Sequence, residues 1–200
     1  SAGLPQGTST PEKIGDQQAT CLLGWTNTFS YNGFSLSFLI DGRFGGDIFS
    51  GTNRMLQANG VAGCTVVDGA RNEFVVDGVI ANEDGSYTQS TISVTPQQYW
   101  SAVASSSGNL GIGEANLYSA TNIRLRNLSL NYTLPKKVLT GTPLQRVKLG
   151  VSCNNVWMIY SDMNGVDPES VFATSTNATG FENASSPTSR TFLFNVTLGF

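Results

Sequence analysis

Five stretches of this sequence alternate apolar and small polar side chains with a period of two. That period puts successive side chains on opposite sides of a β-strand, so each stretch predicts a strand with one apolar and one polar face. The sequence therefore predicts an all-β fold, and the remaining features decide which kind. The stretches cover residues 21–31, 34–43, 120–134, 144–158 and 192–200.

Turn and stop signals separate these strands. Asn32-Gly33 predicts a type I′ hairpin turn, because both residues tolerate positive φ. Pro135 has no N–H for a strand ladder and is expected to end the third strand. Upstream of Leu128 the alternation breaks, and Arg124 and Arg126 fall in the apolar series. Either a β-bulge shifts the register there, or that end of the strand has left the apolar environment.

The long segment between the second and third strands carries structural signals of its own. Residues 95–98 combine an N-cap threonine, a proline at the first helical position and a capping-box glutamine, which predicts a helix. Residues 49–59 predict a short helix ended by a glycine. Asp77-Gly78 lies between two apolar pairs and predicts a hairpin. We therefore interpret residues 45–117 as a folded subdomain, since an unstructured loop of that length is uncommon.

The composition argues against an enzyme. His is absent, which removes the usual Ser-His-Asp and Cys-His catalysis and any His-ligated metal. The thiols of Cys21, Cys64 and Cys153 are too few for a four-thiolate zinc site, and the spacing leaves open whether any two of them pair. A net charge of −3 gives no basic footprint for nucleic acid. We expect no catalytic residue, metal or cofactor. The aspartates are scattered without a base or nucleophile pattern: Asp16, Asp41, Asp47, Asp77, Asp84 and Asp167.

Strand length favours a membrane barrel. The predicted strands are long, whereas strands in soluble proteins usually have about 5–6 residues and about 9–11 tilted residues cross a bilayer. Their apolar faces are rich in Phe, Tyr and Trp near the ends and almost free of charge, and short connections alternate with long ones. Five strands cannot close a barrel, because single-chain bacterial barrels begin at about 8. Since open edges in lipid leave backbone groups unpaired, we expect an arc of a larger transmembrane β-barrel.

A secreted β-sandwich is the alternative, as a carbohydrate-binding or adhesin-like module. Its strands alternate in the same way, with the apolar face turned into a core. Asn-x-Ser/Thr sequons would suit a secreted glycoprotein, but a chain this rich in Asn, Ser and Thr produces them by chance. The sequons begin at Asn127, Asn131, Asn177, Asn183 and Asn195.

Several ordered motifs together resemble one family. The chain is similar to the C-terminal part of SusC/RagA-like TonB-dependent outer-membrane transporters of Bacteroidetes. The resemblance runs through most of the chain. The motifs are GWTNTFSYNGFSLSFLIDGRFGGDIFSGT (24–52), TPQQYW (95–100), NLYSATNIRLRNLSLNYTLPKKVL (116–139), GVDPE (165–169) and TFLFNVTLGF (191–200).

The resemblance implies a function and partners. A member of this family has a 22-stranded barrel with an N-terminal plug and imports a nutrient, here expected to be a glycan or oligosaccharide. It implies a SusD-like surface lipoprotein as a lid, energy from the TonB complex through an N-terminal part that this stretch lacks, and contact with outer-membrane lipid. The expected location is the outer membrane of a Gram-negative bacterium.

The resemblance also divides the chain. Tight connections are expected on the periplasmic side and long ones outside. The expected parts are an extracellular loop end (1–20), a barrel hairpin (21–44), a long extracellular loop subdomain (45–117), a second hairpin (118–158), an extracellular loop (159–188) and a C-terminal barrel strand (189–200).

Candidate site residues follow from this orientation. Asp41 and Arg43 face the lumen and are candidates for the substrate path, although an ion pair within the wall is the more expected role. Arg124 and Arg126 fit near the outer rim, contacting solvent or lipopolysaccharide phosphates. A terminal Phe preceded by apolar residues at alternate positions resembles the signal read by the barrel-assembly machinery. Its residues here are Phe192, Phe194, Val196, Leu198 and Phe200.

Overall fold

The computed structural model describes residues 3–105, 111–163 and 165–200. The undescribed positions fall within the three expected extracellular loops, at 1–2, 106–110 and 164. The chain forms two compact units. Unit 1 comprises residues 1–17, 47–118 and 171–185, and unit 2 comprises residues 18–46, 119–170 and 186–200.

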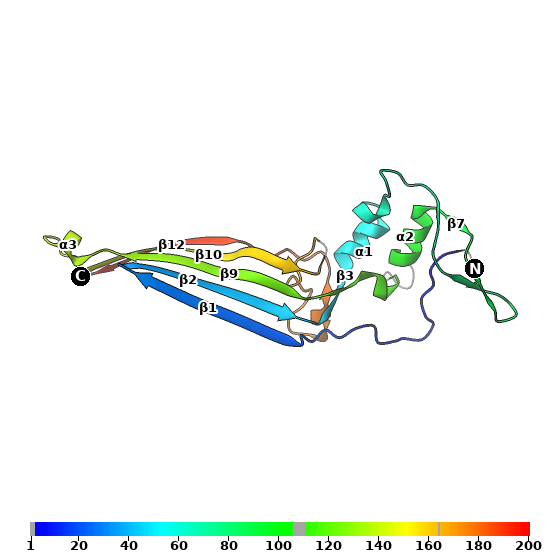
Figure 1. Cartoon of the computed structure of the whole chain (residues 1–200), viewed down its shortest axis with the longest axis horizontal. Coiled ribbons are helices and arrows are strands. Elements are labelled where there is room, and N and C mark those ends of the chain that lie inside the picture. Colours follow the sequence, from blue (N-terminus) through cyan, green and yellow to red (C-terminus); the bar gives the residue numbers. More distant parts are fainter. Residues whose placement is uncertain (1–2, 106–110, 164) are drawn as a thin grey trace. The chain divides into compact units, whose positions relative to one another are not determined.

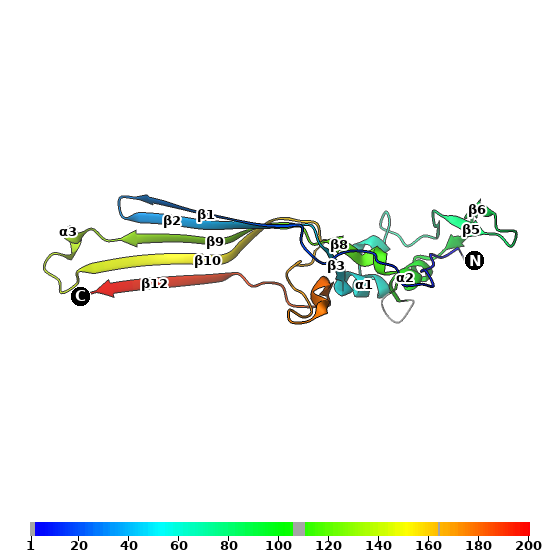
Figure 2. The same ribbon diagram turned by 90° about the horizontal axis from the view of Figure 1, so that it is seen from below.

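Unit 2 is built on one antiparallel five-stranded sheet. Each long strand pairs with the long strand that precedes or follows it along the chain, as Figures 1 and 2 show. The prediction of an all-β fold with about five long antiparallel strands is thus confirmed. In sheet order, the strands are β1 (Cys21–Tyr31), β2 (Phe34–Phe44), β9 (Asn122–Thr133), β10 (Arg146–Ser161) and β12 (Thr191–Gly199).

The predicted turn and stop signals act as expected. Asn32 and Gly33 both have positive φ, at 44° and 85°, as a type I′ turn between β1 and β2 requires. The N–H of Thr133 donates to the carbonyl of Gly33 at 2.8 Å, which ties this turn to the end of β9. Pro135 then breaks the ladder, and the short helix α3 (Lys136–Leu139) leads to β10.

The apolar face of the sheet is largely uncovered within unit 2. Cross-strand partners such as Trp25 and Ile40, or Val151 and Phe194, stand on this face together. Phe194 is 82% exposed and Tyr31 84%. A soluble sandwich would cover such a face with a second sheet, and the described part of unit 2 contains only this one. The sheet therefore needs an apolar surrounding that unit 2 does not supply.

The opposite face carries hydroxyl and amide side chains that meet across strands. Thr28 donates to Ser37 at 3.2 Å, and Asn127 donates to Asn154 at 2.7 Å. Gly150 lies between two asparagines of neighbouring strands, and a Cβ there would collide with both side chains. This face is polar with little charge over most of its length.

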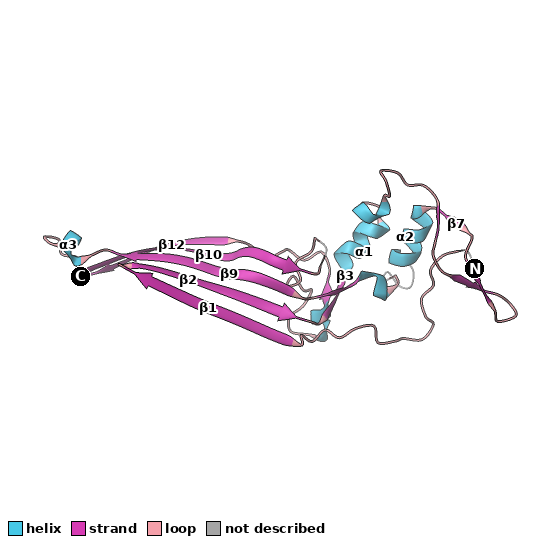
Figure 3. Ribbon diagram, in the orientation of Figure 1, coloured by secondary structure: helices cyan, strands magenta, loops and turns pink. Residues whose placement is uncertain are grey.

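The described part of unit 1 contains helices and small sheets, which Figure 3 colours by type. Helix α1 (Gly51–Ala58) packs against helix α2 (Pro96–Ser105). A three-stranded sheet has the order β11 (Phe181–Glu182), β3 (Asp47–Ser50) and β8 (Leu117–Ser119). Two-stranded ladders pair β4 (Phe74–Val75) with β7 (Ser93–Val94) and β5 (Val79–Ala81) with β6 (Tyr87–Gln89). Short 3-10 helices are η1 (Gly63–Thr65), η2 (Gly113–Asn116) and η3 (Asn177–Gly180).

Both predicted helices are present in unit 1. The Thr95 hydroxyl accepts from the N–H of Gln98 at 3.3 Å, and the Gln98 side chain accepts from the N–H of Thr95 at 2.9 Å, which completes the capping box of α2. Helix α1 begins later than expected, because residues 49–50 belong to β3. Its first turn is held by Glu182, a buried carboxylate that accepts from the Ser50 hydroxyl at 3.0 Å.

The predicted hairpin at Asp77-Gly78 is wrong. The strand before it, β4, pairs with β7, while the strand after it, β5, pairs with β6. The turn lies instead at Gly85, which has a φ of 80°. Short apolar pairs on either side of a turn signal fix neither partner nor register, so the wider subdomain decided the pairing.

Two further features bear on the expectations from composition. All three cysteines are free thiols, Cys21 and Cys64 exposed and Cys153 buried. Among the helices that the structure describes, none is long and apolar enough to span a membrane.

Candidate functional site

The break in alternation near Arg124 is a β-bulge. Along β2 the pairing advances one residue from Leu39 to Ile40, whereas the partners on β9 jump from Asn127 to Leu125. Arg126 is passed over. The residues of β9 that precede it therefore point to the opposite faces from those that strict alternation would give them. Leu125 joins the apolar face beside Ile40, and Arg124 moves to the polar face opposite Asp41. The bulge thus keeps both arginines off the apolar face.

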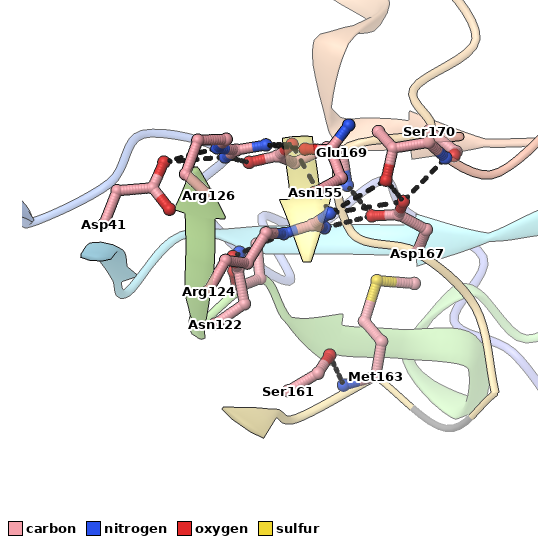
Figure 4. A network of polar contacts seen from close by, with 12 residues as sticks. Asp41, Asn122, Arg124, Arg126, Asn155, Ser161, Met163, Asp167, Glu169 and Ser170 are labelled. Atoms are coloured by element: carbon pink, nitrogen blue, oxygen red, sulfur yellow. Dashed lines mark hydrogen bonds and ion pairs between the residues drawn. The ribbon is translucent and has the colours of Figure 1, made fainter. Parts of the chain in front are cut away.

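Arg124 is buried among polar partners. Its side chain is 4% exposed and forms an ion pair with Asp167, itself 8% exposed. The guanidinium also donates to the Thr188 hydroxyl at 3.0 Å and to the Asn122 side chain at 3.3 Å. Figure 4 shows Arg124 pointing from its strand toward the carboxylate of Asp167. A charge buried to this extent must be paired, and Asp167 supplies the pairing.

Arg126 bridges two carboxylates. Its Nη2 lies 2.7 Å from Asp41 on β2 and 2.5 Å from Glu169. Its Nη1 donates to the side chain of Asn155 at 3.1 Å. Asn155 stands at an irregularity of β10 facing the bulge, with a φ of 50°. Irregular positions on two neighbouring strands therefore meet at one guanidinium, as Figure 4 shows.

Two of the acidic partners, Asp167 and Glu169, come from one turn after β10. The N–H of Ser170 donates to the carbonyl of Asp167 at 3.0 Å, and the N–H of Glu169 donates to the Asp167 side chain at 3.0 Å. Pro168 between the two acids is fully buried. The Ser170 hydroxyl donates to the carbonyl of Ser186 at 2.9 Å. This turn therefore presents two carboxylates on one side while its backbone is fastened to the following segment.

Electrostatics favour the ionised state of Asp167. Burial by itself disfavours a charged Asp167, but the hydrogen bonds from Arg124 and Thr188 outweigh it and hold the pKa of the Asp167 carboxyl well below its usual range. The cluster contains two guanidinium groups and three carboxylates, so its charges nearly balance. We call it the arginine cluster; its members are Asp41, Arg124, Arg126, Asp167 and Glu169.

The arginine cluster is suited to holding segments together rather than to chemistry. Its carboxylates already accept from arginines, and its hydroxyl donor, Thr188, is bound to Asp167 at 2.6 Å. No group of three or more His, Cys, Asp or Glu in the described residues is arranged to hold a metal. The cluster instead fastens the turn after β10 to two strands of the sheet.

The predicted site residues have mixed outcomes. Asp41 forms the ion pair within the wall that the sequence favoured. Arg43 lies on the same face, opposite Asn122 of β9. The expectation that Arg124 contacts solvent or lipopolysaccharide is wrong, because this side chain is buried against Asp167. Whether Asp41 and Arg43 line a substrate path stays a prediction.

The predicted assembly signal lies on one face of β12, except for Phe200, which follows the strand. Phe194 and Val196 pair across the sheet with Val151 and Leu149. The aromatic and aliphatic side chains of this face are exposed, Phe200 at 77%. Their use as an assembly signal stays a prediction.

Sequence reasoning missed Asp167 and Glu169 as partners of the arginines. Both belong to the GVDPE stretch, which was quoted for the resemblance alone. The available signal was two arginines at a break in strand periodicity, which need compensating charge if they are buried. Which acids supply it is decided by a turn lying 43 residues further along the chain.

These features define a class of protein: one unit is a sheet of long antiparallel strands with an uncovered apolar face, and the other is a separately folded loop unit. No family model matches the chain. It is 26% identical over 192 residues to TonB-dependent receptor P3 of Formosa agariphila, covering 94% of this chain and 17% of that protein. It is 31% identical over 150 residues to TonB-dependent receptor P39 of the same organism, covering 73% and 13%.

Solved structures show the same fold. The RagAB peptide importer aligns in its open-open state with a TM-score of 0.55 and 16% identity, and in its closed-closed state with 0.57 and 18%. Each alignment covers 90% of this chain and 17% of the chain compared. The chain thus spans less than a fifth of these relatives. These findings confirm the resemblance to a SusC/RagA-like TonB-dependent receptor, of which the chain corresponds to a segment. The proteins it resembles are receptors and transporters, as expected for a chain without enzyme motifs.

Removing Arg124 should destabilise the end of the sheet at which the arginine cluster lies. Arg124→Met leaves Asp167 buried without its cation, which costs about 3–5 kcal/mol. The exposed pair Lys13–Asp16 offers a control, and Lys13→Met should cost less than about 1 kcal/mol. Thermal unfolding and protease cleavage within 162–170, measured in the full-length receptor, test this. The double variant Arg124→Met, Asp167→Leu should recover much of the loss, and equal effects of Arg124→Met and Lys13→Met would contradict the assignment.

The same turn should loosen in acid. Because the folded pKa of Asp167 lies below its unfolded value of about 3.9, its contribution is complete above that pH and fades as pH falls toward the folded value. The protection of the backbone amides of residues 165–170 against hydrogen exchange, taken relative to their intrinsic exchange rates at each pH, should therefore fall below about pH 4. Asp167→Asn should exchange faster at neutral pH and show a smaller acid response. An identical acid response in that variant would exclude Asp167 as the titrating group.

Proposed function

We propose that the chain is part of an outer-membrane transporter that imports a nutrient into a Gram-negative bacterium. The observation that carries this is the uncovered apolar face of the five-stranded sheet. Lipid would cover that face, and strands of 9 to 16 residues are long enough to cross the hydrocarbon layer when tilted. The likeness to TonB-dependent receptors supports the same assignment.

The open edges of the sheet support a larger barrel. Among the described strands, β1 and β12 each have one neighbour. Unpaired backbone groups in lipid cost several kcal/mol each, so further strands of the same protein would pair with both edges. From the family resemblance, we propose a whole barrel of 22 strands with an internal plug.

The proposed orientation places the tight connections in the periplasm. The turn at Asn32-Gly33 and the connection 135–143 are short, as periplasmic turns are. Residues 1–20, 45–117 and 159–188 then lie outside the cell. Residues 21–44, 118–158 and 189–200 form the wall. The arginine cluster falls at the outer end of that wall, where charged side chains cost little.

The proposed cargo is a glycan or oligosaccharide, delivered beneath a SusD-like surface lipoprotein and imported with energy from the TonB complex. These partners follow from the family resemblance. The RagAB importer carries peptides, so peptide is the competing cargo. Glycans and peptides differ in charge and shape, and uptake experiments can distinguish which of them is the cargo.

Uptake by cells tests the transporter proposal. Deleting the full-length gene should abolish growth on an oligosaccharide as sole carbon source, and disrupting the TonB complex should do the same. In the strain that lacks only the receptor gene, peptide-dependent growth should be unchanged. Loss of peptide uptake alone would mean that the cargo is a peptide and not a glycan. Unchanged growth on every source would overturn the transporter assignment. In the same assay, Asp41→Asn with Arg43→Gln lowers uptake if these residues line the path, and leaves it unchanged if Asp41 only holds Arg126.

Assembly of the barrel is proposed to depend on the last strand. Phe200 and the alternate apolar residues before it would be recognised by the barrel-assembly machinery. Deleting Phe200 should lower the folded, outer-membrane fraction of the receptor, measured by its heat-modifiable migration in detergent gels. Deletion of Ser105, at the end of α2 in unit 1, is a size-matched control that should leave insertion intact. Equal insertion of both variants would remove Phe200 from this role.

A further inference from the structure

A cavity in unit 1 has the chemistry of a binding site. It has a volume of about 380 Å³, and it lies where the end of α1 and the start of α2 meet the intervening loop. Its wall includes the indole of Trp100, the amides of Gln57, Asn59 and Gln97, and Arg71. That volume lies in the range of about 300–1,000 Å³ that is typical of small-molecule sites. None of its lining residues belongs to the arginine cluster.

One of these amides is fixed in place. Gln57 is 7% exposed, and its side-chain oxygen accepts from the Asn116 amide at 2.9 Å. This bond fixes the orientation of the Gln57 amide, whose NH2 is a donor that it can offer to a ligand. The Thr65 hydroxyl beside it donates to the carbonyl of Ala62 at 2.7 Å, which holds the loop wall. The polar part of the cavity is therefore preorganised.

The lining selects among ligand classes. Among the described residues that line the cavity, none is a carboxylate, and the guanidinium of Arg71 already donates to the carbonyl of Gly60 at 2.6 Å. The lining residues come from helices and loops, so an extended peptide would find no strand edge to pair with. An aromatic face beside planar amide groups suits a sugar ring, whose C–H face stacks on the indole while its hydroxyls bond the amides.

A neighbouring cavity extends the site. It has a volume of about 360 Å³ and shares Trp100, Pro96 and Thr65 with the first. Its wall adds Tyr99, whose ring packs edge-on against Trp100 at a centroid distance of 5.0 Å. Asp68 and Glu73 also line it, which disfavours a polyanionic ligand. A ligand of more than one ring could lie across both cavities with Trp100 between them.

We propose that the paired cavities at Trp100 are a capture site for a neutral oligosaccharide. The proposal rests on the proposed function, because it assigns a place on the receptor to the cargo class named there. Trp100 supplies the stacking surface, and Gln57 and Gln97 supply hydrogen bonds to hydroxyl groups. The site would hold cargo on the loop unit before transport.

Binding to the full-length receptor in detergent tests the site. Titration calorimetry with a panel of neutral di- to hexasaccharides should detect binding to the parent protein. Trp100→Ala should weaken it by about 10-fold or more, as removal of a central aromatic contact does. Trp100→Phe should retain most of the affinity. Gln97 is exposed, so Gln97→Ala should fold normally and weaken binding severalfold.

Tyr87→Ala is the matched control, because Tyr87 is a 70% exposed aromatic residue of unit 1 outside both cavities. It should bind as the parent does. Equal saccharide affinity of the parent and Trp100→Ala would overturn the capture site, as would binding of mixed peptides but no saccharide. Cellular uptake is measured separately. If the Trp100→Ala receptor takes up saccharide as well as the parent does, the capture site is rejected but the transporter is not. If the parent receptor supports no uptake at all, the transporter proposal itself is rejected.

Discussion

An apolar sheet face that unit 2 does not itself cover is the constraint on which the rest of the structure depends. Burying apolar surface is worth roughly 25 cal/mol per Å², so a face carrying Trp25, Phe29 and Phe194 at more than half exposure needs an apolar surrounding. A bilayer meets that need and also requires that every backbone group be paired. The antiparallel meander pairs the inner strands, and β1 and β12 are left for neighbours.

The bulge at Arg126 shows how one extra residue separates two environments. Without it, Arg124 and Arg126 would continue the series of Leu128 and Leu130 on the apolar face. With it, both guanidinium groups turn to the polar side and meet carboxylates from β2 and from the turn after β10. The polar face therefore changes from hydroxyl and amide side chains to a charged, cross-linked end, while the apolar face continues with Leu125 beside Ile40. A strand irregularity and a set of ion pairs depend on each other here.

The loop unit, unit 1, is stabilised in a different way from the sheet. Its core is small, with Ile48, Val94 and Val103 among the buried residues, and much of its order comes from polar contacts. The buried carboxylate of Glu182 holds the start of α1, which ties a distant stretch of chain to this helix. The cavities at Trp100 are lined by residues of this unit alone.

The sequence by itself determined the strands, the Asn32-Gly33 turn, the stop at Pro135 and the start of α2, because each depends on neighbours within a few residues. It also located the break in periodicity at Arg124 and Arg126. Only the tertiary structure decided that a bulge resolves this break, that Asp167 and Glu169 supply the compensating charge, and that β4 pairs with β7 rather than with β5. These outcomes join residues far apart in the chain, and such pairings follow from packing and charge burial that no local pattern encodes.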